Sequence, residues 1–340
     1  MKIKDYLTEA TVDDAIKGAE KAAYSNSEGT VEKVLDRALK TARRMQKTGG
    51  KEFPNVMFRG AAGSGKTAKV EAWAANNGIN LVSYKASSLD PTDFGGAVAP
   101  DAETKTVRRY ANDEWSILDR PNTVLFLDEY NRAKSSARDP LLALVNEHTV
   151  PDVREESGKR YLPNLLFTIA CVNPNDGTYD VHAMDPAHVG RFYTIDVVPN
   201  ALDTLGYLEH HYNKELSATK DPEEQKEIQG RLNLAKALLS NKSFEFDNAE
   251  EVSAAAESES ASLSPRTFTK ALEFCDGTKE DFLFYWNGNC NPTKKSMVER
   301  ILANYEDVDD KANDAIKGDT ESDVFKQKPA SMWDKIQGSL

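Results

Sequence analysis

Residues 56–67 read Val56-Met57-Phe58-Arg59-Gly60-Ala61-Ala62-Gly63-Ser64-Gly65-Lys66-Thr67, a short apolar run followed by a glycine-rich loop. The glycines lack Cβ atoms, so the backbone can curl and point successive N–H groups at a polyphosphate. In this pattern Lys66 reaches the β- and γ-phosphates, and the Thr67 hydroxyl holds Mg²⁺. The residues from Lys66 onward predict a helix that ends at Gly78, and its N-terminus favours bound phosphate. The stretch therefore predicts a nucleoside triphosphate site.

Composition limits the remaining classes of function. The chain has 340 residues, 39% of them hydrophobic, and a net charge of −12. This charge argues against a general nucleic-acid surface, which needs a basic face. The three cysteines form no Cys-x-x-Cys pair, so neither zinc nor a disulfide framework is indicated. No secretory signal or membrane-spanning run is visible, so we expect a cytoplasmic protein.

The order of apolar runs predicts the domains. Between 53 and 200, short apolar runs alternate with helical patterns, which indicates an α/β domain with a parallel five-stranded sheet flanked by helices. Residues 201–305 predict a smaller α-helical lid, residues 1–52 an N-terminal helical extension, and residues 306–340 an acidic, mobile tail. The predicted strands are Val56–Phe58, Asn80–Tyr84, Thr123–Leu127, Leu165–Val172 and Phe192–Val198; the predicted lid helices are 201–216, 222–240, 265–275 and 293–305.

Two further segments have local patterns. Residues 151–154 and 159–162 predict a hairpin with its turn at 155–158. Lys105, Arg108, Arg109 and Tyr110 are the one hint of a basic, aromatic surface for nucleic acid, and a solvated helix face explains them equally well.

A second strand ends in two carboxylates. The run Thr123-Val124-Leu125-Phe126-Leu127 precedes Asp128 and Glu129. Asp128 is suited to orient Mg²⁺, and Glu129 to polarise the attacking water. A solvated acidic turn is the alternative, and it is disfavoured by the phosphate loop upstream.

Three polar residues elsewhere are candidates for the same site. Asn173 follows a buried strand and is suited to bind the attacking water or the γ-phosphate; an ordinary Asn-Pro turn is the alternative. Arg191 precedes the last strand, where it is badly placed to reach the nucleotide of its own chain and well placed to reach that of a neighbouring subunit. The alternative is that Arg191 is an ordinary surface cation. Arg266 begins a lid helix and can touch the γ-phosphate, with a purely capping role for this segment as the alternative.

The motifs together resemble AAA+ ATPases of the MoxR/dynein-related group, which includes cobaltochelatase small subunits and nitric-oxide-reductase or rubisco activases. The resemblance covers about residues 50–275. It rests on Leu127-Asp128-Glu129-Tyr130-Asn131-Arg132-Ala133, Leu141–Glu147, Asn173-Pro174 and Gly190-Arg191-Phe192.

The resemblance implies ATP and Mg²⁺ as cofactors, with Walker A at Gly60–Thr67 and Walker B at Asp128 and Glu129. It also implies sensor 1 at Asn173, an arginine finger at Arg191 and sensor 2 at Arg266. Each nucleotide would lie between subunits of a homo-oligomeric ring, usually a hexamer, with Arg132 as a second interface residue. Phe94-Gly95-Gly96 and the 150–162 hairpin match pore-facing or inserted loops. Tyr130 replaces a common aliphatic residue, and Gly190 replaces the usual aspartate.

We therefore expect an ATP hydrolase that remodels or activates a partner protein or metallo-complex. Members of this group often act with a von Willebrand A-type partner, which the resemblance implies here. A nucleic-acid-directed motor or nuclease-associated translocase is the alternative, and a nucleotide-gated scaffold with little turnover is a third class. The presence of Glu129 and Arg191 argues against the scaffold.

Overall fold

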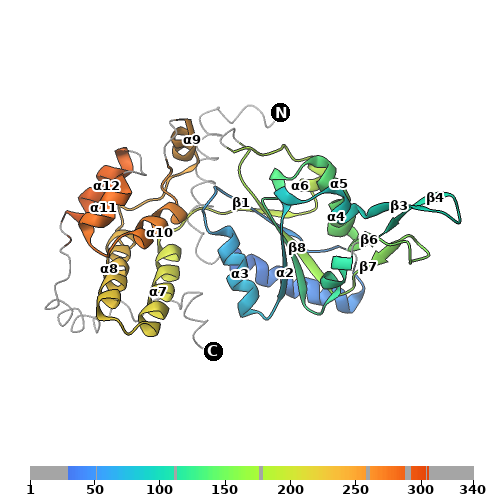
Figure 1. Ribbon diagram of the computed structural model, residues 1–340, viewed down its shortest axis with the longest axis horizontal. Coiled ribbons are helices and arrows are strands. Elements are labelled where there is room, and N and C mark those ends of the chain that lie inside the picture. The colour runs from blue at the N-terminus through green and yellow to red at the C-terminus, as the bar shows by residue number, and fades with distance from the viewer. Residues whose placement is uncertain are drawn as a thin grey trace, which may run out of the picture.

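The computed structural model describes residues 30–50, 52–110, 113–175, 179–257, 261–287, 292–303 and 305. A sheet domain and a helical lid lie side by side (Figure 1). The predicted tail at 306–340 and the first 29 residues of the predicted N-terminal extension lie outside the described residues. None of the described helices is long and apolar enough to cross a bilayer.

The sheet of the described residues has five strands, all of them parallel. Its order is β2-β5-β8-β1-β9, with β1 (Val56–Arg59), β2 (Asn80–Lys85), β5 (Thr123–Asp128), β8 (Leu165–Val172) and β9 (Tyr193–Asp196). The predicted fold is confirmed. Four of the five strands match the predicted bounds within one residue, while β9 is shorter at both ends than predicted.

Both faces of the sheet are buried. Along β5, Val124 and Phe126 pack with α2 (Thr30–Thr48) and α3 (Lys66–Asn76). The alternate residues Leu125 and Leu127 pack with α4 (Pro91–Gly95) and α5 (Ser135–Glu147) on the other face. Because successive side chains of a strand point to opposite faces, a run without polar residues is what a doubly covered strand requires. The carboxyl ends of these strands are thereby held in one rigid row.

The lid is built from helices around an aromatic core. They are α7 (Ala201–Ala218), α8 (Pro222–Leu239), α9 (Ala249–Glu257), α10 (Pro265–Phe274), α11 (Lys279–Asn287) and α12 (Pro292–Leu302). The sequence patterns did not predict α9 and α11. Phe282 and Trp286 of α11, four residues apart, are fully buried beside Phe268. An ion pair between Lys69 of α3 and Asp203 of α7 joins the sheet domain to the lid.

A hairpin of β3 (Ala97–Asp101) and β4 (Thr106–Tyr110) projects from the sheet domain on the side away from the lid (Figure 1). The helix-face interpretation of residues 105–110 is therefore wrong. The turn is fixed by Asp101, whose carboxylate accepts the N–H groups of Glu103 and Thr104 at 3.0 and 3.2 Å. An aspartate side chain that accepts nearby backbone N–H groups in this way favours a turn over a helix interior.

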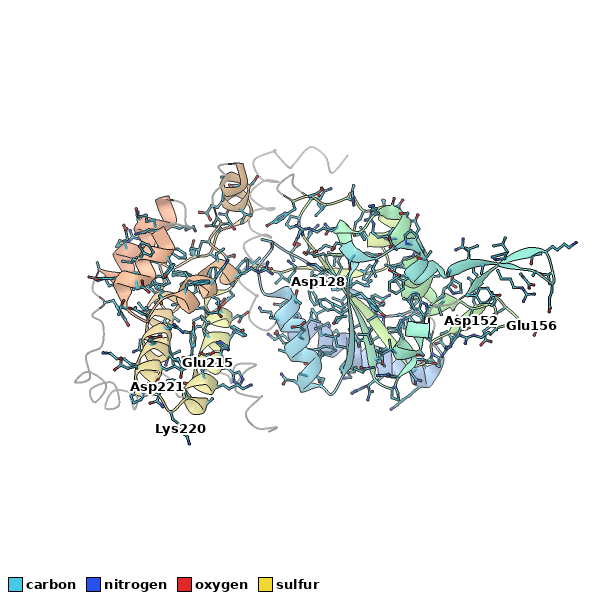
Figure 2. All side chains as sticks on the ribbon, in the orientation of Figure 1. Asp128, Asp152, Glu156, Glu215, Lys220 and Asp221 are labelled. Atoms are coloured by element: carbon cyan, nitrogen blue, oxygen red, sulfur yellow. The ribbon has the colours of Figure 1, made fainter. Side chains whose placement is uncertain are left out.

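The predicted second hairpin is present as β6 (Thr149–Pro151) and β7 (Lys159–Tyr161), with its first strand beginning two residues earlier than expected. Asp152 ends that strand because its carboxylate accepts the N–H of Arg154 at 3.0 Å. The labels of Asp152 and Glu156 in Figure 2 mark this hairpin. Phe94, which the resemblance placed near a pore loop, is 3% exposed and packs on Trp115 with ring centroids 4.4 Å apart. Phe94 is therefore a core residue.

Candidate active site

The phosphate loop joins the carboxyl end of β1 to the N-terminus of α3, as predicted. Gly65 has φ +83°, a conformation that favours glycine. A Cβ on Gly60 would lie 2.3 Å from the carbonyl oxygen of Val197, so the loop can pass β9 only without a side chain there. The two glycines allow a tight backbone cradle at a helix N-terminus, and this fits a polyphosphate.

Lys66 is buried against the loop that it follows. Its Nζ donates to the carbonyl oxygens of Gly60 at 2.6 Å and Ala61 at 2.9 Å. The same Nζ lies 3.5 Å from Oδ1 of Asn173. Burial lowers the pKa of Lys66. The ammonium group is thus held at the centre of the cradle, beside the residue predicted as sensor 1.

Thr67 and Asp128 meet although 61 positions separate them in the chain. The Thr67 hydroxyl donates to Oδ2 of Asp128 at 2.9 Å. Figure 2 shows Asp128 in the part of the sheet domain that faces the lid. A hydroxyl and a carboxylate oxygen at this spacing are hard donors of the kind Mg²⁺ prefers. The two predicted metal residues therefore fit this ion.

Glu129 is held in a strained backbone conformation at the end of β5, with φ +53°. Its carboxylate accepts from the Ser87 hydroxyl of η2 (Ala86–Ser88) at 3.0 Å. It also accepts from Arg132 at 3.2 Å. Arg132, the predicted second interface residue, is therefore engaged with a carboxylate of its own chain. Ser87 gave no signal in the sequence, because a serine after a strand is common in turns.

Asn131 links the loop after β5 to the residue after β8. Its Nδ2 donates to the carbonyl oxygen of Asn173 at 2.7 Å, and its Oδ1 accepts the Asn173 N–H at 3.2 Å. Both side chains are buried. The reciprocal pair fixes the backbone of Asn173, so that its side chain can face Lys66. Asn131 belongs to one of the motifs on which the resemblance rests, and its position in the sequence alone does not show this pairing.

The lid contacts the phosphate loop directly. A Cβ on Gly63 would lie 2.9 Å from Oγ of Ser264 and 3.1 Å from Cβ of Arg266. Ser264 caps α10 together with Thr267, in a reciprocal capping box. The structure thus brings Arg266 to the loop as the sequence suggested, and its contact with a γ-phosphate stays a prediction.

Tyr179 is a loop contact that the sequence did not predict. Its hydroxyl accepts the N–H of Ala62 at 3.2 Å, so a side chain 117 residues away occupies one of the loop amides. Nothing in the local pattern around Tyr179 marks this role.

Arg191 lies apart from the residues above. It precedes β9 by two residues, near the amino end of the strand, whereas the phosphate loop leaves the carboxyl end of the adjacent β1. Parallel pairing of β1 and β9 puts these two ends at opposite edges of the sheet. One guanidinium nitrogen donates to the carbonyl oxygen of Ala187 at 2.5 Å, and Nε has no partner among the described residues. Arg191 is therefore not part of its own chain's phosphate site.

Comparison with known proteins gives little beyond this geometry. No family model matches the sequence, and no curated protein matches it. The chain is similar to the solved structure of the RuvB Holliday junction branch migration motor of Thermotoga maritima, with 15% identity and a TM-score of 0.39. The match covers 89% of this chain and 78% of that one. The interpretation of the site therefore depends on its own contacts.

Proposed function

We propose that the protein is a ring-forming ATPase of the AAA+ type that uses Mg-ATP hydrolysis to remodel a partner protein or metallo-complex. The observation that carries this proposal is the meeting of three other chain segments at the phosphate loop. Thr67 contacts Asp128, Lys66 approaches Asn173, and the start of α10 with Arg266 packs on Gly63. A chance glycine-rich turn would not gather these side chains.

Each residue has a role that follows from its place. Lys66 would neutralise charge that develops on the transferred phosphoryl group, and Mg²⁺ held by Thr67 and Asp128 would supply further electrostatic stabilisation. Glu129 would accept a proton from the attacking water, which Asn173 orients. Arg191 cannot serve its own loop and would complete the site of the adjacent copy in a ring, which is typically a hexamer. Arg266 would couple loss of the γ-phosphate to movement of the lid.

A steady-state phosphate-release assay tests this function. Glu129→Gln should lower kcat by about 10²-fold or more, since general-base help has that magnitude. Arg191→Ala should lower it by about 10³-fold while nucleotide binding to the isolated chain persists, because the arginine acts on a neighbour. Wild-type rates in both variants would refute the proposal.

The partner class is a protein in this proposal, and the hairpin of β3 and β4 weakens the nucleic-acid alternative. Arg108 pairs with Asp101 at 2.7 Å, and Arg109 donates to the Gly95 carbonyl oxygen at 3.2 Å. The Asp101 carboxylate thus compensates Arg108, which leaves Lys105 and Arg109, among the described residues, as the uncompensated cations of the hairpin. Phosphate binding needs several uncompensated cations. Pull-down with the Glu129→Gln variant in ATP should retain a protein client and no nucleic acid.

A further inference from the structure

Tyr130 contacts both sides of the segment that carries Arg191. It lies in η4 (Tyr130–Arg132), directly after Glu129, and its side chain is fully buried. Its hydroxyl is 3.0 Å from Nδ1 of His188, in α6 (Pro186–Val189). Its ring packs on Phe192 with centroids 5.8 Å apart. One side chain therefore contacts the third residue before Arg191 and the first residue after it.

The hydrogen bond has a defined direction. On its other side, Nε2 of His188 is 3.5 Å from a carboxylate oxygen of Asp139. A carboxylate can only accept, so a neutral imidazole with its proton on Nε2 satisfies both contacts, and the Tyr130 hydroxyl donates to Nδ1. Burial lowers the pKa of His188, which keeps the ring in this neutral form. Tyr130 and His188 are both at least 96% buried, so water does not compete for the bond.

The segment from His188 to Phe192 is short and internally bonded. The Arg191 N–H donates to the carbonyl oxygen of His188 at 3.3 Å, and its guanidinium donates to that of Ala187. A shift of His188 would therefore move Arg191 with it. Tyr130 also belongs to the loop that follows β5, which carries Glu129 directly before it and Asn131 directly after it. Asn131 in turn holds the backbone of Asn173.

From these contacts we infer that Tyr130 is a positioning residue that couples the Glu129 loop of one subunit to the arginine which the same subunit offers to its neighbour. The inference rests on the proposed function, because it assumes that Arg191 acts on an adjacent copy. The state of one nucleotide site would then change turnover at the next site through the Tyr130–His188 bond. A tyrosine supplies this bond, and the aliphatic residue common at this position in the resembling family cannot.

Rings of two co-expressed full-length variants test the coupling. In a mixture of Arg191→Ala and Glu129→Gln subunits, each with strongly reduced turnover alone, a pocket of the first variant can receive the arginine of the second. Recovery of ATPase activity shows action across subunits. Tyr130→Phe is then added to the arginine donor in one mixture, and to the pocket subunit in another.

The expected result is asymmetric. Tyr130→Phe in the arginine donor should lower the recovered rate about three- to tenfold, the range expected for loss of one neutral hydrogen bond. The same change in the pocket subunit should have a clearly smaller effect. His188→Leu should likewise lower the recovered rate more when it is placed in the arginine donor than when it is placed in the pocket subunit. Tyr212→Phe is the matched control, since it removes a buried lid hydroxyl that has no hydrogen-bond partner among the described residues.

The outcomes separate the two proposals. If the parent mixture does not recover activity, Arg191 does not act across subunits, and both the proposed function and the coupling fail. If the parent mixture recovers and Tyr130→Phe acts equally in both places, or more in the pocket subunit, the coupling alone is overturned. A general loss of structure would lower both mixtures alike, so it would count against the coupling.

Discussion

Replacing Asn131 with alanine should damage both stability and turnover. The Asn131 side chain is 4% exposed and makes two hydrogen bonds with the backbone of Asn173, at 2.7 and 3.2 Å. Each bond contributes about 1 kcal/mol, and the buried groups left without a partner add a further penalty. We expect Asn131→Ala to lower the free energy of unfolding by about 2–4 kcal/mol.

Asn55 provides a control with nearly the same chemistry. It is also 4% exposed, its Nδ2 donates to the Val145 carbonyl oxygen at 2.8 Å, and its Oδ1 accepts the Thr168 N–H at 2.8 Å. Asn55→Ala should therefore lose a similar stability. The two amides differ in position, because Asn55 precedes β1 at the edge opposite the phosphate loop and only Asn131 holds Asn173.

Urea denaturation followed by circular dichroism measures stability, and phosphate release measures turnover at a temperature where both variants are folded. Asn131→Ala should lower kcat about tenfold or more, since Asn173 loses the contacts that orient it toward Lys66, whereas Asn55→Ala should stay within about twofold of wild type. Equal losses of kcat in the two variants would refute the reasoning, as would a stability loss below about 1 kcal/mol for Asn131→Ala.

Other expectations concern the loop, the metal and pH. Gly63→Ala should lower the free energy of unfolding by about 1–3 kcal/mol, because the φ of Gly63 is +80° and a Cβ there would lie 2.9 Å from Oγ of Ser264. The same change should weaken binding of a fluorescent ATP analogue, and unchanged affinity would contradict this expectation. Thr67→Val and Asp128→Asn should each raise the MgCl₂ concentration that gives half-maximal phosphate release, measured by titration with MgCl₂, and an unchanged midpoint would exclude the assigned metal role. Burial lowers the pKa of His148 to about 3, below its unfolded value, so the stability from this group is complete above about pH 6.5 and falls as the pH drops toward 3. At pH 5 the loss is about 2 kcal/mol, and His148→Asn should flatten the pH dependence of the urea midpoint between pH 7 and 5; the same slope in the variant would count against this origin.

The local features of the fold could be predicted from the sequence because they depend on neighbouring residues. Apolar runs such as Leu165–Val172 form strands buried on both faces, and the glycines of 60–67 permit the positive φ angles that the loop requires. The same applies to Asp128 and Glu129 at the end of a strand. Helix α11 was not predicted because residues 282–286 are apolar at every position and therefore show no helical period. The hairpin of β3 and β4 was not predicted because its strands are mostly exposed and lack an alternation of buried and exposed residues.

The sequence by itself determined that a phosphate loop, two carboxylates, an amide and two arginines are present and lie at the ends of regular elements. Only the tertiary structure decided which of them meet. Parallel strand order brings Thr67 to Asp128 and Lys66 to Asn173, and it places Arg191 at the opposite edge of the sheet. Contacts such as those of Asn131 and Tyr130 join residues 42 and 58 positions apart, and no local pattern encodes them. They depend on how the strands pack, because a hydrogen bond between buried side chains forms only where the whole sheet has set their separation.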